Sequence, residues 1–333
     1  MDIGKVSESA LKRSVLKYVQ LNNKAVRNTS ELLVGAGVGT DAAVLKSASD
    51  KVVTTTQTRI GRKRSVVVEA MIAACNNISC MGANAEAVQI SLVLPEEAYE
   101  SELRHMMEEA LEFTKEQQIF ISGGHTTVSP YVTETVATVT AIGTLNEWKS
   151  KQPKAGMDIV ISKWIGLEGT VQIANAKTDE LEKRLPKWFV ANAQKFNQYA
   201  LVIDEASIAT KEDVAMMHDA SGGGIFRALW EVAEYAGTGL RVELKKIPLK
   251  QETVEVCEVF GLNPYELLSG GALLMVTEHG ESLVEKLVEN EIEAAVIGTL
   301  TDDKDKVIVT HGDDGEELRY LDKPKTDEID KIL

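Results

Sequence analysis

Hydrophobic residues recur at helical spacing in three stretches of the first half of the chain. Leu11, Val15 and Val19 share one helical face, which predicts an amphipathic helix over 7–19. Residues 65–81 are almost continuously apolar, so we expect a helix that is buried over much of its surface. A third helix is predicted by a one-sided set of apolar residues: Leu103, Met106, Met107, Ala110 and Leu111.

Between these helices, short runs of β-branched residues predict strands. They cover 44–45, 51–56, 88–94, 119–122 and 132–142. A polar segment, 146–154, follows and contains Pro153, which is typical of a domain boundary. We therefore expect an N-terminal domain over 1–150 and a C-terminal domain over 151–333.

The second half alternates the two periods again, which predicts a second α/β layer. Strands are expected at 158–162, 240–244, 272–277, 294–300 and 306–310, and helices at 253–260, at 281–289 and from Ile225 onward. The acidic end of the chain, from Asp302, is expected to form a hairpin and then a solvated tail. The pattern as a whole predicts an α/β (α+β) protein with two domains.

The most informative polar stretch is 218–224, because its three glycines lie where a loop becomes a helix. Gly222, Gly223 and Gly224 allow close approach of the backbone to a ligand, and a helix N-terminus favours an anion. Ser221 lies in the same turn, and Asp219 offers a carboxylate for a metal that bridges phosphate oxygens. The alternative is that Asp219 or Ser221 caps the helix and the glycines only form a turn.

Two further glycine-rich segments suggest ligand contacts. The loop 35–43 contains Gly39 and ends near Asp41, a second candidate metal ligand, although a mobile turn with a solvated carboxylate is equally consistent. The segment 123–126 is predicted to be a turn in which Gly123 and Gly124 permit close approach, with His125 and Thr126 as donors. His125 could instead cap or pack within that turn.

Two isolated polar residues complete the candidates. Asn77 follows Asn76 inside the apolar helix 65–81, and buried amides need partners, either neighbouring backbone or a ligand. Lys163 follows the strand 158–162 and could face a phosphate, although a lysine at such a position is more often solvated.

Composition narrows the class of protein. The net charge of −15 makes nucleic acid a poor partner, and no apolar run is long enough to cross a membrane. Three cysteines, an odd and small number, favour a reducing compartment over a disulfide framework. The N-terminus lacks a signal-peptide core, so a cytoplasmic protein is expected.

Four motifs in order resemble the aminoimidazole ribonucleotide (AIR) synthase superfamily. They are the segments 38–43, 76–83, 122–126 and 218–224. The segments 165–170 and 266–271 are most similar to HypE-type hydrogenase maturation factors and related proteins. The resemblance extends from about Val38 to Leu300.

The resemblance implies a two-domain PurM-like fold, with an N-terminal β-rich domain that dimerises and a C-terminal α/β domain. It implies that ATP and Mg²⁺ bind near the interface of a homodimer and that an oxygen of an acceptor is activated by phosphorylation. In HypE, the acceptor is a carbamoyl group on a C-terminal cysteine, which becomes a nitrile. The residues implied to contact ATP are Gly39, Asn77, Gly123, Gly124, His125, Thr126, Lys163, Ser221, Gly222, Gly223 and Gly224, with Asp41 and Asp219 on the metal.

The chain departs from the family pattern at two acidic positions. Thr56 stands where an acid is usual after the strand, and Asn77 stands where an Asn-Asp pair usually supplies a carboxylate. An amide oxygen can still bind Mg²⁺, but with less affinity than a carboxylate. The chain also ends Ile332-Leu333, without the HypE cysteine, and lacks the N-terminal nucleophile of selenophosphate synthetase.

Three hypotheses follow, and none of them assigns a catalytic residue. The first is an ATP-dependent, Mg²⁺-dependent phosphotransferase-like enzyme whose acceptor is a small molecule or a group on a protein. The second is a nucleotide-binding maturation or regulatory partner with little turnover, which the missing acids favour. The third is a HypE-type factor whose carbamoyl carrier lies on a partner protein.

Overall fold

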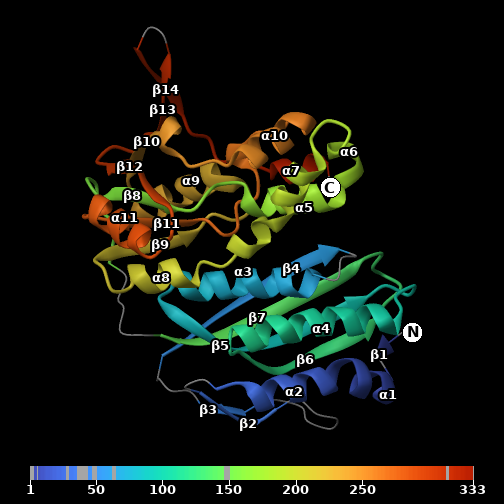
Figure 1. The fold of residues 1–333 in the computed structure, drawn as a ribbon. Coiled ribbons are helices and arrows are strands. Elements are labelled where there is room, and N and C mark those ends of the chain that lie inside the picture. Colours follow the sequence, from blue (N-terminus) through green and yellow to red (C-terminus); the bar gives the residue numbers. More distant parts are fainter. Residues whose placement is uncertain are drawn as a thin grey trace. The chain divides into compact units, whose positions relative to one another are not determined.

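The chain forms two compact units, Met1–Glu147 and Trp148–Leu333, in a computed structural model of all 333 residues. The division falls in the polar segment where the sequence predicts a boundary. The structure describes residues 4–5, 7–27, 30–35, 44–46, 51–61, 65–145, 151–312 and 315–332. Each unit has its own sheet and its own helices (Figure 1).

A five-stranded sheet organises the N-terminal unit, with the strand order β1-β6-β5-β7-β4. Strands β5 and β6 are parallel, and the other neighbours are antiparallel. The strands are β1 (Gly4–Lys5), β4 (Val52–Gly61), β5 (Ala83–Leu94), β6 (Phe120–Val128) and β7 (Thr135–Leu145). A separate antiparallel pair consists of β2 (Glu31–Val34) and β3 (Val44–Lys46).

Helices cover one face of this sheet. They are α1 (Glu8–Leu11), a π-helical turn (Lys12–Leu16), α2 (Lys17–Ala25), α3 (Val66–Cys80) and α4 (Glu100–Glu116). Helix α3 packs on β4, β5 and β7, α4 lies between α3 and α2, and α2 contacts β6. The predicted helices over 65–81 and around Leu103–Leu111 are confirmed, and the predicted helix over 7–19 continues to Ala25.

The opposite face of the sheet carries threonines from neighbouring strands. Thr56 lies opposite Thr140, and Thr58 lies opposite Thr138, with hydroxyl oxygens 2.9 and 3.0 Å apart. Thr56 and Thr58 are exposed, whereas the residues of β7 on the helix side, such as Ala137, are fully buried. The sheet therefore has one helix-covered face and one face, the threonine face, of exposed and half-buried side chains. The threonine face is defined by the exposed Thr54, Thr56, Thr58 and Ile60 and the half-buried Thr138 and Thr140.

A seven-stranded sheet organises the C-terminal unit, with the strand order β14-β13-β10-β12-β8-β11-β9. Only the pair β10–β13 is parallel among the described strands of this sheet. The strands are β8 (Asp158–Ser162), β9 (Val214–Asp219), β10 (Gly239–Glu243), β11 (Leu273–Thr277), β12 (Ala294–Thr301), β13 (Lys306–Gly312) and β14 (Gly315–Tyr320). All five strands predicted in this half are confirmed within a few residues.

Several helices of the C-terminal unit contribute to its apolar clusters. They are α5 (Leu167–Ala176), α6 (Thr178–Leu181), α7 (Lys187–Gln194), α8 (Ile203–Ala209), α9 (Gly224–Ala236), α10 (Gln251–Phe260) and α11 (Gly280–Glu289), with 3₁₀ turns at Lys195–Tyr199, Leu244–Lys246, Pro264–Glu266 and Glu328–Lys331. One cluster joins α9 to the sheet through Ile225, Leu229 and Val232. The other joins α5, α7 and α10 and includes Ile329 near the chain end.

The end of the chain corrects one prediction. The hairpin after Asp302 is present as β13 and β14, which project from the sheet in Figure 1. The tail after it is not a solvated end, because Leu321, Glu328 and Ile329 are buried. None of the helices in the described part of the chain combines the length and the apolar character that a membrane span requires.

Candidate functional site

The glycine turn between β9 and α9 forms where the sequence predicts it. Strand β9 ends at Asp219, and α9 begins at Gly224 after Gly223. Gly223 (φ 79°) and Gly224 (φ 64°) both adopt the left-handed conformation, which residues with a Cβ rarely tolerate. The turn 219–224 thus presents backbone N–H groups at the positive end of a 13-residue helix.

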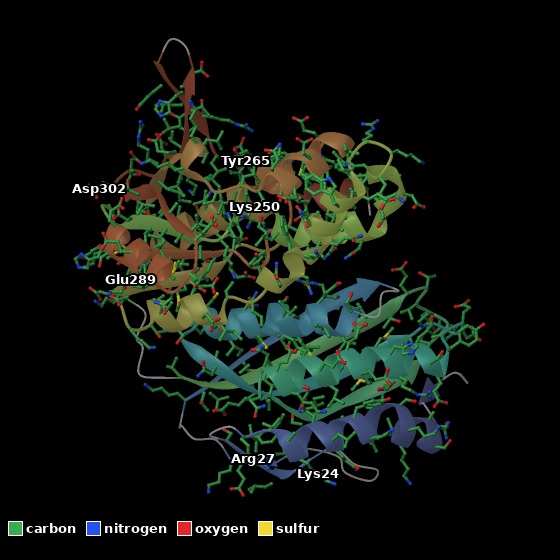
Figure 2. All side chains as sticks on the ribbon, viewed as in Figure 1. Lys24, Arg27, Lys250, Tyr265, Glu289 and Asp302 are labelled. Atoms are coloured by element: carbon green, nitrogen blue, oxygen red, sulfur yellow. The ribbon has the colours of Figure 1, made fainter. Side chains whose placement is uncertain are left out.

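The turn is fixed by a second loop, 263–271. The N–H of Ser269 donates to the carbonyl of Ser221 (3.2 Å), and the N–H of Ala220 donates to the carbonyl of Ala272 (3.0 Å). Tyr265, labelled in Figure 2, stacks on Phe226 in the first turn of α9, with ring centroids 5.3 Å apart. The position of the glycine turn therefore depends on this loop as well as on its own sequence.

A second helix begins on the same loop. Gly166 (φ 70°) precedes α5, and its N–H donates to the hydroxyl of Ser269 (2.8 Å). One turn later, the N–H of Gly169 donates to the carbonyl of Leu268 (2.8 Å). Ser269 is buried, and it contacts the residues that precede both α5 and α9. The N-termini of these two helices, which carry partial positive charge, therefore lie against the same loop.

The acidic and hydroxyl groups of the turn differ in exposure. Asp219 is 7% exposed and pairs with Leu273 of β11, Ser221 is half-buried, and Gly222 is exposed. A carboxylate at a strand end beside a glycine turn and a helix N-terminus suits a phosphate with its metal ion. Mg²⁺ needs only one or two carboxylates when phosphate oxygens and waters complete its shell, so the donor set fits.

Beside Asp219, a charged cluster surrounds Glu231 of α9. His218, Arg227 and Lys323 place nitrogens 3.2, 3.1 and 3.2 Å from its carboxylate oxygens. The hydrogen bond from His218 is the largest cause that lowers the pKa of Glu231 to about 2, from an ordinary value of 4.5. Burial opposes this shift, and Arg227 and Lys323 add to it.

The Glu231 cluster predicts a dependence of stability on pH. A carboxylate whose pKa is lower in the folded state stabilises the fold above its unfolded pKa, and this contribution is lost as pH falls from 4.5 towards 2. We expect wild type to be more stable than Glu231→Gln above pH 4.5 and the difference to disappear near pH 2. Urea unfolding followed by tryptophan fluorescence measures it. A constant difference between the two proteins at every pH would contradict the prediction.

Lys163 contacts protein groups only, among the described residues. It is 7% exposed, and its ammonium lies 2.7 Å from a carboxylate oxygen of Glu205, which is also buried. It donates to the carbonyls of Tyr199 (3.0 Å) and Leu201 (2.5 Å) as well. These three acceptors match the three ammonium protons, so in this structure the side chain holds the segment 199–205.

Asn77 lies on the helix-covered side of the N-terminal sheet. Its amide nitrogen is 3.4 Å from the hydroxyl of Thr55, which pairs with the fully buried Ala141. Thr56, the next residue of β4, points to the threonine face. The two positions at which the chain departs from the family pattern therefore lie on opposite sides of one edge strand.

The predicted turn at 123–126 is wrong, because these residues continue strand β6. Gly124 pairs with Ile90 of β5, and a Cβ at Gly124 would collide with the backbone carbonyl of Ile90. The glycine is thus required by strand pairing. His125 is exposed and lies opposite Ser91, on the threonine side, whereas Thr126 lies opposite the buried Leu92.

The described candidates of the N-terminal unit lie apart across its sheet. Strands β5 and β7 separate β6 from β4, so His125 and Asn77 are about 14 Å apart in strand spacing alone and on opposite sides of the sheet. Gly39 and Asp41 lie outside the described residues. The residues that the structure does bring together are those of the glycine turn, Asp219 to Gly224.

Two protein-family patterns match the chain and identify its family. The N-terminal domain of AIR synthase related proteins matches residues 39–145, and the C-terminal domain of the same proteins matches residues 154–311. The chain belongs to the AIR synthase related family. The predicted resemblance and the predicted two-domain PurM-like fold are both confirmed.

Known relatives of this AIR synthase related protein include hydrogenase maturation proteins. A Methanocaldococcus jannaschii protein named for hydrogenase expression and formation is 28% identical over 241 residues, which is 70% of each chain. A solved HypE in complex with ATP has a TM-score of 0.75 at 18% identity, covering 97% of this chain and 96% of that one. A chain of a HypE–HypF complex has a TM-score of 0.69 at 24% identity, covering 85% and 93%.

The AIR synthase related chain also has a hollow whose described lining residues include none of the predicted site residues. It measures about 560 Å³ and lies between α2 and β2 in the N-terminal unit, where Lys24 and Arg27 are labelled in Figure 2. Asn23 lines the hollow, and its side-chain amide forms hydrogen bonds with the backbone N–H and C=O of Ile121 (both 2.9 Å).

Three residues of the candidate site were missed by sequence reasoning. Ser269 joins the two helix starts, Gly166 begins α5, and Asp327 accepts the N–H of Gly223 (2.6 Å). The first two lie in segments 165–170 and 266–271 that the sequence singled out for similarity alone. Asp327 begins a short helical turn with Asp330 three residues later, a capping pattern that marks a helix start and gives no sign of its long-range partner.

Proposed function

We propose that this chain is an ATP-binding, Mg²⁺-dependent member of the AIR synthase related family that activates an oxygen of its acceptor by phosphorylation. The acceptor is a small molecule or a group carried on a protein. One observation supports the proposal above all: a buried carboxylate, Asp219, ends a strand directly before a left-handed glycine turn at the start of a long helix. The fold shared with a HypE that was solved with ATP adds support.

In the proposed reaction, the acceptor oxygen attacks the γ-phosphorus of ATP. The bond from that phosphorus to the β–γ bridging oxygen breaks, ADP leaves with the electron pair, and the acceptor proton passes to solvent. Mg²⁺, when bound, neutralises charge on the phosphate oxygens. Ser221 and the N–H groups of 222–224 would orient the phosphates, and Asp219 would hold the metal. Lys163 is assigned to loop positioning because its three donors are engaged.

A second function, a nucleotide-binding maturation or regulatory partner with little turnover, is favoured by the threonine face. Thr56 stands where the family pattern has an acid, and its hydroxyl pairs with that of Thr140 (2.9 Å). Asn77 contributes an amide that contacts Thr55. Uncharged groups at both positions bind Mg²⁺ more weakly than carboxylates, which would lower turnover more than nucleotide binding.

The threonine face supports a homodimer as the working form. Strand β4 presents exposed Val52, Ile60 and threonines on this side of the N-terminal sheet, and the family resemblance predicts pairing of this domain across a dimer. A protein partner is also proposed, because a HypE chain with this fold was solved with HypF. The charge of −15 argues against nucleic acid, and we expect a cytoplasmic location.

ATP binding in the presence of Mg²⁺, measured by calorimetry, tests the proposal. We expect wild type to bind ATP and Asp219→Asn to bind it about tenfold or more weakly, because a metal ligand loses its charge. Asp204→Asn, an exposed acid of α8, is the matched control and should bind like wild type.

Turnover separates the two candidate functions. If ATP binds without hydrolysis and Thr56→Asp raises the hydrolysis rate, the partner function is supported. Hydrolysis by wild type that depends on Asp219 supports the enzyme. The absence of ATP binding at any Mg²⁺ concentration would refute both.

A further inference from the structure

The segment 321–332 returns from the end of strand β14 and packs against the C-terminal unit. Leu321 belongs to the cluster that joins α9 to the sheet, and Ile329 belongs to the cluster of α5, α7 and α10. Between them the chain is half-buried to exposed from Asp322 to Asp327. Buried apolar residues, Leu321 and Ile329, therefore fix this mostly polar segment at both of its ends.

The carboxylate of Asp327 lies on the glycine turn. Its Oδ2 accepts the N–H of Gly223 (2.6 Å), and its Oδ1 accepts the N–H of Leu268 (3.1 Å) and of Ile329 (3.0 Å). Gly223 directly precedes α9, and Leu268 belongs to the loop that fixes the turn. One carboxylate therefore bridges the two backbone segments that build the candidate site.

An anionic group of the protein itself thus occupies N–H groups suited to an anion. The N-terminus of α9 attracts negative charge, and a carboxylate and a phosphate compete for the same donors. Burial is the largest influence on Asp327 and raises its pKa, whereas the hydrogen bonds from Ile329, Gly223 and Leu268 lower it. Burial therefore disfavours the charged carboxylate, and the three hydrogen bonds favour it. An anion that fits these N–H groups better can replace the carboxylate of Asp327.

Two further contacts hold the segment close to the turn. Lys323 lies 3.2 Å from Glu231 and 4.6 Å from the ring centroid of Trp230, both on α9. Glu328, which is buried, accepts the N–H of Asn263 (3.0 Å) at the start of the loop 263–271. The segment therefore contacts both α9 and the loop 263–271.

We propose that the segment 322–332 is an intramolecular latch whose Asp327 carboxylate occupies the phosphate position of the glycine turn, so that nucleotide and latch exclude each other. The inference rests on the proposed ATP site and adds its regulation. Nucleotide binding displaces Asp327 from Gly223 and Leu268, and any partner that draws the tail away raises the affinity for nucleotide. The apolar ends at Leu321 and Ile329 keep the latch close for return.

The strength of the latch follows from its tether. A group attached by a short segment competes at an effective concentration in the millimolar range, so its removal should tighten ATP binding by about tenfold. Calorimetry of the full chain with ATP and Mg²⁺ compares wild type with Asp327→Ala and Asp327→Asn. Asp322→Asn is the matched control, because it removes the same charge from an exposed position of the same segment.

We expect both Asp327 variants to bind ATP about tenfold more tightly than wild type and Asp322→Asn to bind like wild type. Hydrogen exchange of wild type provides a second readout that needs no variant: ATP should speed exchange of the amides of 327–332. Equal or weaker binding by the Asp327 variants, or slower exchange of 327–332 with ATP, would overturn the latch while the ATP site stands. Failure of wild type and variants alike to bind ATP would overturn the site and the latch together.

Discussion

Replacement of Lys163 by methionine is expected to lower the free energy of unfolding of the C-terminal unit by about 3–5 kcal/mol, because it leaves a buried carboxylate without its counter-charge. The partner is Glu205, whose oxygen lies 2.7 Å from the ammonium. The substitution also removes the hydrogen bonds that the ammonium donates to the carbonyls of Tyr199 and Leu201. All four tryptophans of the chain lie after residue 147, so urea unfolding followed by their fluorescence reports on this unit.

Two controls separate charge from packing in this experiment. Lys195→Met changes an exposed lysine and should stay within about 0.5 kcal/mol of wild type. The double variant Lys163→Met with Glu205→Gln should be more stable than Lys163→Met alone, because a neutral amide needs no counter-charge. If Lys163→Met unfolds at the same urea concentration as Lys195→Met, the ion pair does not stabilise the unit.

The burial of Lys163 shows what a local pattern omits. The sequence places a lysine directly after a strand, which predicts a solvated or phosphate-facing side chain. Its actual environment depends on Glu205, which lies on α8, and on the carbonyls of 199 and 201, none of which is close in sequence. A residue whose partners come from another element cannot be placed from its neighbours alone.

The glycines of strand β6 show that backbone requirements also depend on residues far away in the sequence. Two successive glycines before a histidine predict a turn, because glycine is common where chains reverse. In the fold both glycines lie in a strand parallel to β5, and only at Gly124 would a Cβ collide with Ile90. Strand pairing is a long-range property, so the sequence predicts the need for glycine here and misses the reason.

Local patterns are sufficient where one element supplies its own signal. Helix α3 is almost continuously apolar, and α4 and α9 are long and apolar on one side, so the sequence predicts all three. The start of α9, predicted at Ile225 and observed at Gly224, was predicted within one residue because the glycines mark the change from a loop to a helix. The latch was missed because its apolar anchors, Leu321 and Ile329, are single residues in an acidic segment.

The three glycines of the turn provide a graded test of the site. Gly222 is exposed, and a Cβ there would meet nothing within 4 Å, so Gly222→Ala should change stability by less than about 0.5 kcal/mol. Gly223 has φ 79°, and its Cβ would meet only the side chain of Arg227, so Gly223→Ala should cost about 1–2 kcal/mol of backbone strain. Gly224 combines φ 64° with a collision against the backbone of Tyr265 and Glu266.

Gly224→Ala is therefore expected to have the largest effect of the three, about 3 kcal/mol in unfolding free energy, because neither the strain nor the contact can be relieved by a side-chain rotation. The loop 263–271 would have to move away from α9, and Ser269 and Leu268 would move with it. ATP binding should then fall together with stability for Gly224→Ala and stay at the wild-type level for Gly222→Ala. Equal stability of the two variants would show that α9 and the loop are not packed as described. Equal ATP affinity despite a destabilised Gly224→Ala would place the phosphates away from this turn.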